Sequence, residues 1–318
     1  MSNEALRKKL AELAKLAEES GVDVSKDMER LENKIREATQ TETAWNHVEL
    51  ARHPGRPYSL DYISRIFDNF TELHGDRAFA DDPAIVGGLA FLDGRPVTVI
   101  AHQKGRTLQQ HIGRNGGMAN PEGYRKALRL AKQAEKFRRP VITFVDTPGA
   151  YPGLGAEERG VGESIARNLR DFSRLKTPIV CVIIGEGGSG GALGICVGDK
   201  VYMMENAVYS VISPEGCASI LLRDSGRAKD AAAMLRISSG DLMAFNVIDG
   251  IIKEPPGGAH NDPDAAAASI KETLTKDIAA LLKLDRESLV RARNQKIRSI
   301  GHFACCWTND VDTTILKP

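Results

Sequence analysis

The chain has 318 residues, which is long enough for one large domain with appendages. Its 43 basic and 42 acidic side chains nearly cancel, so the overall charge indicates neither a nucleic-acid partner nor a membrane surface. No apolar run approaches the roughly 20 residues that span a bilayer, and the charged N-terminal stretch is unlike a signal peptide. The five cysteines lack the paired spacing of a zinc site or a disulfide framework, which predicts reduced thiols, no bound metal and a cytoplasmic protein.

Residues 1–50 carry apolar side chains at helical spacing on both sides of a break. Leu6 and Leu10 precede the break at Gly21, and Leu31 belongs to the stripe that resumes after it. Two amphipathic helices joined by a glycine turn form an αα-hairpin, so we expect an N-terminal helical hairpin here. Such a hairpin cannot bury its apolar stripe alone. It packs either on the body of the protein or on another chain, and the sequence leaves both arrangements open.

The main domain is expected at residues 51–303, followed by an atypical tail at 304–318. Early in this domain, two β-rich runs at 85–92 and 97–101 flank a turn-like Asp-Gly-Arg-Pro segment and predict a β-hairpin. A helix comes next, for which Pro121 occupies the first position, where proline is preferred.

Strands and helices then alternate along the chain. A strand at 141–145 leads through a loop at 146–155 into a helix, and a strand at 179–184 leads through a glycine-rich loop at 185–191 into a short helix. Apolar strands that alternate with helices pair in parallel, so the pattern predicts an α/β core. Two more strands and two C-terminal helices are expected at residues 200–204, 207–212, 265–284 and 285–300.

Two loops lie where α/β proteins place their sites, at the carboxyl ends of parallel strands. They are DTPGAYPG at residues 146–153 and GEGGSGGA at residues 185–192, and five of the seven residues from 185 to 191 are glycine. Glycine lets a ligand approach the main chain closely, and the start of a helix adds unpaired N–H groups and the positive end of the dipole. The second loop therefore predicts a binding site for an anion or an oxyanion.

Two short patterns in these loops suggest nucleotide chemistry, and both lack the context that they need. Gly185, Gly187 and Gly190 fit the dinucleotide fingerprint, and Glu205 stands at the acidic position. The helix between them is too short, however, and the rest of a nucleotide-binding half is missing. Residues 146–149 fit the D-x-x-G of GTPases, but the chain has no G-x-x-x-x-G-K-[ST] loop to hold phosphates.

Residues 187–191 also fit G-x-S-x-G, the nucleophile elbow of serine hydrolases. In that interpretation Ser189 is the nucleophile, and His260 is a conceivable base. Alternatively, Ser189 is only a small residue that tolerates a tight bend. A further alternative is a non-catalytic scaffold subunit whose glycine loops only pack. The remaining interpretation is an oxyanion hole made of main-chain amides, with no side-chain nucleophile.

Seven segments of the chain occur in the same order as in one known family. They are ARHPGRPYSLDYI (51–63), GDRAFADDPAIVGGLA (75–90), PEGYRKALRLA (121–131), DTPGAYPGLGAEERG (146–160), IGEGGSGGALGI (184–195), YSVISPEGCASIL (209–221) and EPPGGAH (254–260). They resemble the signature segments of acetyl-CoA carboxylase carboxyltransferase alpha subunits. The resemblance runs from about residue 25 to about residue 303. The sequence departs from the family at the N-terminus and in the tail after Phe303.

This resemblance implies a crotonase (ClpP-like) fold, an α/β spiral of stacked ββα units. The implied reaction transfers a carboxyl group from carboxybiotin on a carrier protein to acetyl-CoA and forms malonyl-CoA for fatty acid synthesis. The implied partners are a carboxyltransferase beta subunit in an α2β2 tetramer, the biotin carboxyl carrier protein and biotin carboxylase. The alpha and beta subunits of the family share the active site, so we expect this chain to work only beside its partner.

The resemblance assigns an oxyanion hole to the backbone amides of Gly190 and Gly191, facing the ureido group of biotin. Negative charge develops on the ureido oxygen and on the acceptor enolate in the transition state, where preorganised N–H donors act most strongly. The biotin enolate can take the methyl proton, so no general base is required from the protein. Further substrate-binding candidates around these loops are Gly149, Ala150, Gly187 and Gly188.

Basic side chains cluster after the second strand of the predicted hairpin. We expect Lys104 and Arg106, with Arg114 nearby, to bind CoA phosphates or the carrier protein. A solvated charged loop explains the same pattern equally well. His102 ends the preceding strand, where a core histidine is the usual outcome.

Overall fold

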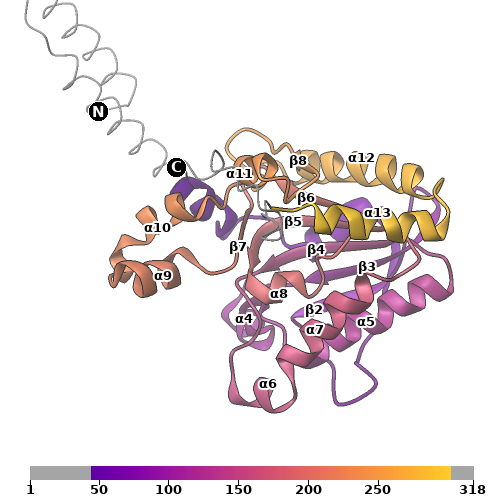
Figure 1. Ribbon diagram of the computed structural model, residues 1–318, viewed down its shortest axis with the longest axis horizontal. Helices are drawn as coiled ribbons and strands as arrows, with labels where there is room; N and C mark the ends of the chain where they lie inside the picture. The colour runs from indigo at the N-terminus through magenta and orange to yellow at the C-terminus, as the bar shows by residue number, and fades with distance from the viewer. Residues whose placement is uncertain (1–43, 302–318) are drawn as a thin grey trace, which may run out of the picture.

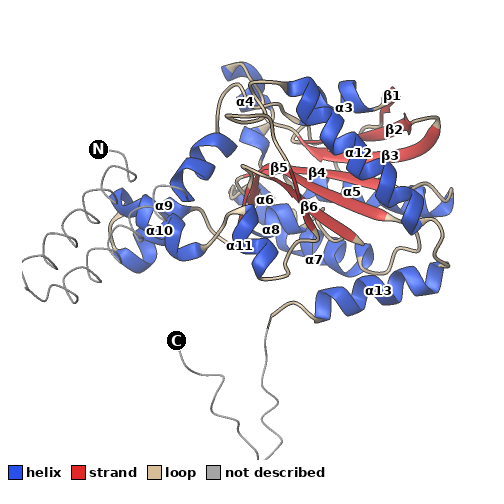
Figure 2. Cartoon of the chain, turned by 90° about the horizontal axis from the view of Figure 1, so that it is seen from above, coloured by secondary structure: helices blue, strands red, loops and turns tan. Residues whose placement is uncertain are grey.

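The structure of the protein is a computed structural model that describes residues 44–301. A twisted β-sheet with helices on both faces forms its centre (Figures 1 and 2). Most of the predicted hairpin, at 1–50, and the predicted tail, at 304–318, lie outside the described residues. Residues 44–51 are helical, and Val48 packs with Val208 and Ile237 in a small cluster beside the main core.

One sheet of eight strands runs in the order β1-β2-β3-β4-β5-β6-β8, and β7 pairs with β5. The strands are β1 Asp68–Glu72, β2 Ile85–Leu92, β3 Arg95–His102, β4 Val141–Thr147, β5 Ile179–Gly188, β6 Lys200–Met204, β7 Val208–Ser210 and β8 Gly250–Ile252. The first two pairings are antiparallel, and every pairing from β3 onward is parallel. The predicted α/β class is therefore confirmed.

Helices cover both faces of this sheet, with α12 on one side and α5, α7 and α8 on the other (Figure 1). The helices are α3 Ser59–Ile66, α4 Leu108–Gly113, α5 Pro121–Lys136, α6 Leu154–Glu158, α7 Val161–Phe172, α8 Ser189–Leu193, α9 Pro214–Cys217, α10 Ala228–Leu235, α11 Ser239–Ala244, α12 Pro263–Leu281 and α13 Arg286–Arg298, with single turns at η1 Asn115–Gly117, η2 Ala218–Leu222 and η3 Ser225–Arg227. Because both faces are covered, all seven residues of β4 are buried.

The predicted hairpin is confirmed. β2 pairs with β3 from Ile85 opposite His102 to Leu92 opposite Arg95, so only Asp93 and Gly94 form the turn. Both turn residues have positive φ, 48° and 76°, as a two-residue turn that matches strand twist requires. β3 therefore begins two residues before the predicted start at residue 97.

The glycine-rich segment at 185–191 is not the loop that the sequence predicts. β5 continues through it to Gly188, and α8 begins at Ser189 with no residue between. The physical reason is pairing, since Gly187 lies opposite Tyr209 and Gly188 opposite Ser210 on β7. A ladder of strand hydrogen bonds outweighs the low strand propensity of glycine.

The helix predicted after residues 146–155 is divided into α6 and α7. Gly160 lies between them with φ of 80°, a left-handed conformation that ends one helix and starts the next. The predicted C-terminal helices are present as α12 and α13, and Asp285 caps the second by accepting hydrogen bonds from the amides of Glu287 and Ser288.

Candidate active site

The carboxyl ends of β3, β4 and β5 meet at one edge of the sheet, because these strands pair in parallel. The segment after β4 lies directly against the turn after β5. A Cβ atom added to Gly188 would lie 2.1 Å from the Pro148 carbonyl oxygen, and one added to Gly191 would lie 2.3 Å from the Gly149 carbonyl carbon. Only glycine permits this approach, so the two predicted loops form one site.

Gly190 borders a cavity of about 260 Å³ at this edge. α8 begins at Ser189, so the amides of its first turn have no partner inside the helix. The cavity is lined by Ser189, Gly190, Leu193, Tyr209, Ser210, Val211, Leu242 and Val247. This mostly apolar lining with a main-chain donor at its edge suits a small apolar ring system that carries one polar oxygen.

Gly191 lies behind Gly190, buried against the backbone of Gly149 and Ala150. It is not among the residues that line the cavity. The structure thus separates the two predicted donors. Gly190 reaches the cavity, whereas Gly191 joins α8 to the loop after β4, and the catalytic role of each stays a prediction.

Hydrogen bonds within the loop after β4 fix its conformation. The Thr147 hydroxyl accepts a hydrogen bond from the Gly149 amide at 3.1 Å and donates one to the Gly149 carbonyl at 2.6 Å. Ala150 forms an isolated bridge with Ala119. Gly187 and Gly188 line a smaller cavity of about 30 Å³ between this loop and α9. Substrate binding by Gly149, Ala150, Gly187 and Gly188 remains a prediction.

His102 is buried at the end of β3, and neither ring nitrogen has a hydrogen-bond partner within the described residues. Burial, together with the positive charge of Lys104, lowers the pKa of His102 to about 3, and the Gly191 backbone opposes this only in part. The imidazole is therefore neutral at physiological pH. The expected core histidine is present, but its polar atoms are left unsatisfied.

Lys104 and Arg106 are both engaged with protein groups. The Lys104 ammonium contacts Asp146 Oδ1 at 2.7 Å and Glu186 Oε2 at 2.9 Å, and its side chain is only 10% exposed. Arg106 pairs with Asp61 and lies over the Tyr58 ring, 4.7 Å from its centroid. Phosphate binding by these two residues is untested, and in this structure each cation already has a carboxylate partner.

Ser189 stands at the junction of β5 and α8 with φ of 53°, as in a nucleophile elbow. No histidine, aspartate or glutamate lines the cavity that Ser189 borders, in the part of the chain that the structure describes. His260 stacks instead on the His53 ring, with centroids 3.8 Å apart. The geometry therefore gives the Ser189 hydroxyl no base, and the elbow serves to start α8.

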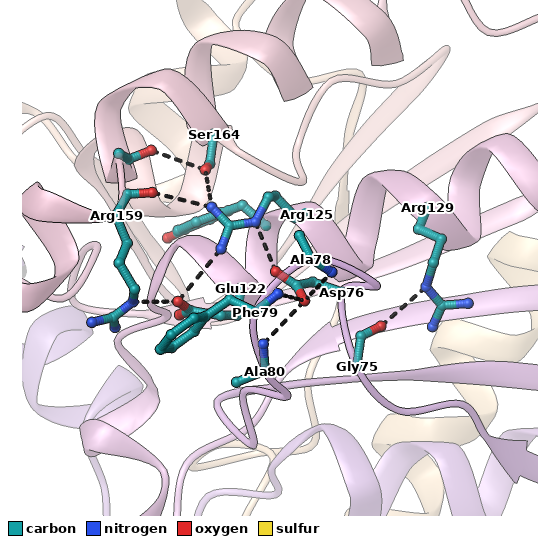
Figure 3. Close-up of polar contacts among 12 residues, drawn as sticks. Gly75, Asp76, Ala78, Phe79, Ala80, Glu122, Arg125, Arg129, Arg159 and Ser164 are labelled. Atoms are coloured by element: carbon teal, nitrogen blue, oxygen red, sulfur yellow. Dashed lines mark hydrogen bonds and ion pairs between the residues drawn. The ribbon is translucent and has the colours of Figure 1, made fainter.

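A polar cluster fixes the helices behind the site (Figure 3). Asp76 Oδ1 accepts hydrogen bonds from three successive amides, at residues 78–80, and its Oδ2 accepts one from Arg125 Nε at 2.8 Å. Arg125 also donates to the Arg159 carbonyl, at the end of α6, and to the Ser164 hydroxyl of α7, which ties α7 to α5. α7 in turn supports α8, because Asn168 Nδ2 donates to the Gly194 carbonyl at 2.8 Å.

The cavity-lining residues outside the glycine turn were not predicted from the sequence. Tyr209, Ser210 and Val211 belong to the segment YSVISPEG, which carries the family resemblance but shows no chemical signature of its own. The pairing of β7 with the end of β5 brings this segment to the site. The sequence therefore contains this segment as a family motif, but no local feature of the segment predicts that it lies at the site.

Solved structures share this architecture. The chain superposes on transcarboxylase 12S, solved with methylmalonyl-coenzyme A bound, with a TM-score of 0.53 and 20% identity over 79% of this chain and 43% of that chain. A Pseudomonas malonate decarboxylase hetero-tetramer in complex with coenzyme A gives a TM-score of 0.56 and 16% identity over 69% of this chain and 89% of that chain. These neighbours share the α/β fold of this chain, and the predicted crotonase-like fold class is confirmed.

The sequence comparisons narrow this class to one family. A family profile described as acetyl co-enzyme A carboxylase carboxyltransferase-like matches residues 2–301. The acetyl-coenzyme A carboxylase carboxyl transferase subunit alpha of Treponema denticola is 64% identical over 96% of this chain and 100% of its own length. The corresponding subunit of Geobacillus sp. is 54% identical over 94% of this chain and 93% of its own length. The chain belongs to the acetyl-CoA carboxylase carboxyltransferase alpha-subunit family.

Carboxyl transfer to acetyl-CoA, which gives malonyl-CoA, is the role of this family, and the chain is a transferase subunit of that kind. The profile match begins at residue 2, which corrects the expectation that the sequence departs from the family at its N-terminus. The match ends at residue 301, before the tail. Between residues 44 and 301, no helix combines the length and the apolar character that crossing a membrane requires.

Proposed function

We propose that this chain supplies the half of the carboxyltransferase site that receives the biotin ureido group, with the Gly190 amide as the main oxyanion donor. The observation that carries the proposal is the position of Gly190, which lies in the first turn of α8 and borders a mostly apolar cavity of about 260 Å³. The bicyclic ring of biotin is apolar apart from its ureido edge, so it fits such a cavity.

The chemistry needs stabilised oxygens more than it needs side-chain acids or bases. When the carboxyl group leaves the donor, negative charge develops on the ureido oxygen, and an amide aimed at that oxygen lowers the barrier. The acceptor methyl group gives its proton to the ureido group that has lost the carboxyl group, and the resulting carbanion attacks the released carboxyl carbon. Ser189, Tyr209 and Ser210 are the polar side chains around the cavity. None of them is required as a nucleophile in this scheme.

In this proposal the Gly190 amide is held in place by Gly191, Gly149 and Ala150. The contact of Gly191 with the Gly149–Ala150 backbone leaves α8 little freedom to shift. Gly187 and Gly188 lead β5 into the turn and line the smaller cavity beside it. The oxyanion hole is therefore rigid before substrate binds, as electrostatic catalysis demands.

The thioester half of the site belongs, in our proposal, to a carboxyltransferase beta subunit, in an α2β2 assembly in the cytoplasm. A biotin carboxyl carrier protein delivers the carboxybiotin that biotin carboxylase has charged. Membership of a family of alpha subunits supports this arrangement. Assaying this chain with and without a beta-type subunit, with carboxybiotin and acetyl-CoA, tests it: malonyl-CoA should form only in the mixture.

Removing the Gly190 N–H tests the donor itself. Proline lacks the N–H group and is tolerated in the first turn of a helix, but it disfavours the left-handed conformation of Ser189 before it. The double variant Ser189→Gly/Gly190→Pro relieves that conflict, and Ser189→Gly alone is its matched control. We expect the double variant to lose about 10²–10³-fold in kcat relative to the control. Equal activity of the two would refute the oxyanion role of Gly190.

A further inference from the structure

β5 changes partner just before the glycine turn, at a bulge. Asp146 alone on β4 lies opposite residues 184–186 of β5, so β5 has two more residues than β4 in this stretch. The pairs on either side are Val145 with Ile183 and Thr147 with Gly187. Up to Ile183 β5 pairs with β6 on its other side, and from Glu186 onward it pairs there with β7. Bulges bend a strand and redirect its continuation, so this one sets the direction in which β5 enters α8.

Charged side chains satisfy the backbone groups that the bulge takes out of the ladder. Arg56 Nε donates to the Ile184 carbonyl at 2.7 Å, and the Glu186 amide donates to Asp146 Oδ1 at 3.0 Å. Arg56 is 1% exposed and Asp146 is 2% exposed. Buried backbone groups need partners, so these two side chains stabilise the irregular strand.

Ion pairs hold these side chains in turn. Lys104 bridges Asp146 and Glu186, and Arg56 forms two hydrogen bonds with Glu254, at 2.6 and 3.0 Å. Burial opposes the charge on Lys104, but the two carboxylates outweigh it and raise the pKa of the ammonium. Burial likewise opposes the charge on Glu186, yet Lys104 and then Arg52 lower the pKa of this carboxyl. Lys104 and Glu186 therefore both stay charged across the physiological range.

We infer that Lys104 is a positioning residue for carboxyl transfer: by bridging Asp146 and Glu186 across the bulge, it fixes the direction of β5 and hence the aim of the Gly190 amide. The inference rests on the proposed oxyanion role of Gly190. It assigns to Lys104 a task other than the phosphate binding that the sequence suggests. Arg56 stabilises the bulge from its other side, by donating a hydrogen bond to the Ile184 carbonyl.

The contacts of Lys104 separate these two tasks. An ammonium group has three donors, and two of them already point at carboxylates within 3 Å. A phosphate ligand raises the affinity for acetyl-CoA, so its loss appears in KM and only with substrates that carry phosphates. A positioning residue acts on the transition state, so its loss appears in kcat with any acyl thioester.

The test uses the complete alpha–beta enzyme and compares acetyl-CoA with acetyl-pantetheine, which has no phosphate. For Lys104→Met we expect a fall in kcat of about 10²-fold, the size of effect that a small misplacement of a reacting group produces. The fall should be equal with both substrates, and KM for acetyl-CoA should change by less than about 2-fold. Lys104→Arg should recover most of the activity, because Lys104 borders a cavity of about 260 Å³ that has room for the larger cation.

Lys104→Met leaves the buried Asp146 carboxylate without its cation and leaves Glu186 only its pair with Arg52. The variant is therefore compared at equal folded concentration with Lys104→Met/Glu186→Gln, which removes one charge of each sign. Both variants lose the bridge, so both should show the kcat defect. Lys132→Met is the matched control, because the Lys132 ammonium lies on the exposed side of α5 and pairs with Asp171 at 2.7 Å, outside the bulge. It should leave kcat unchanged.

Two results would overturn the inference. One is an increase in KM for acetyl-CoA on Lys104→Met that disappears with acetyl-pantetheine, which would make Lys104 a phosphate ligand. The other is an unchanged kcat in the folded variants. If Ser189→Gly/Gly190→Pro is inactive while Lys104→Met is fully active, only this inference fails. If the Gly190 double variant keeps its activity, the proposed function fails first.

Discussion

Two buried ion clusters lie at opposite ends of β5, and they use the same chemistry for different purposes. At the amino end, Arg293 of α13 pairs with Asp199 at 2.7 Å and donates to the carbonyl of Thr177 just before the strand. At the carboxyl end, Lys104 pairs with Asp146 and Glu186 beside the glycine turn. Each cluster gives backbone groups their hydrogen bonds, and the second also borders two cavities.

Burial and charge alone therefore do not identify a functional residue. The Arg293 side chain is inaccessible to solvent, and its partners belong to the segments that join α7 to β5 and α8 to β6. Its role is to hold the α13 helix on the body of the domain. The Lys104 cluster instead holds a bulge that directs the β5–α8 turn.

The largest effect is expected at the amino end. Arg293→Met removes one partner of a buried pair and leaves Asp199 and three carbonyls without their donor, so unfolding should become easier by about 3–5 kcal/mol. Chemical denaturation measures this loss. Arg291→Met, on the exposed side of the same helix, is the control and should cost little. In the fraction that remains folded, kcat should be normal, and a specific kcat defect would break the comparison.

Gly191→Ala should disturb the site at the carboxyl end of β5 without removing any charge. The added methyl group would lie 2.3 Å from a backbone carbon of Gly149, so α8 must move away from the loop after β4. We expect kcat to fall about 10²-fold, because the Gly190 amide moves with α8. Gly162→Ala on α7, where the methyl group meets no atom within 4 Å, should leave kcat unchanged. A fully active Gly191→Ala enzyme would show that the contact does not set the aim of the amide.

His102, at the carboxyl end of β3, makes the folding stability of the protein sensitive to acid. Its pKa is about 3 in the folded protein against an ordinary value of 6.5, so the unfolded chain binds a proton more readily throughout this interval. Folding stability should therefore fall as pH drops from about 6.5 toward 3, by up to about 1.4 kcal/mol per pH unit. His102→Met removes the titrating group from a site where neither ring nitrogen has a hydrogen-bond partner between residues 44 and 301.

The measurement is urea unfolding of the wild type and of His102→Met at several pH values. The two stability curves should converge near neutral pH and separate at lower pH, with the variant less sensitive to acid. Parallel curves would mean that His102 is solvated or paired in the folded protein, contrary to its burial.

The regular parts of the fold were predictable because their signals are local. The β2–β3 hairpin is encoded by two β-rich apolar runs around Asp93-Gly94, and α5 is marked by Pro121 at its first position. β4 and β5 are continuous apolar runs, which buried parallel strands require. The glycine turn was predicted as the site for the same reason, since its composition is unusual wherever it lies in the chain.

The bulge and its charged partners were not predictable, because nothing local indicates them. Arg56, Lys104 and Glu254 lie far apart in the sequence, and each resembles an ordinary surface charge next to glycine or proline. Only the parallel order of the strands brings Lys104 beside Asp146, and only the extra residues of β5 create backbone groups that need Arg56. Lys104 was selected as a site residue for its charge, and its contacts give it a different task.

The smallest effect is expected from Ser189→Ala. The hydroxyl lines the cavity but has no acid or base beside it among the described residues, so its loss should change kcat by less than about 3-fold. Alanine keeps the side-chain volume small and still occupies the left-handed conformation with φ of 53°. Steady-state assay of the alpha–beta enzyme checks this, with Ser210→Ala as the control for the second serine hydroxyl at the cavity. Complete loss of activity in Ser189→Ala alone would mean that the hydroxyl attacks the substrate. The proposal that main-chain amides at the β5–α8 turn act without a side-chain nucleophile would then have to be abandoned.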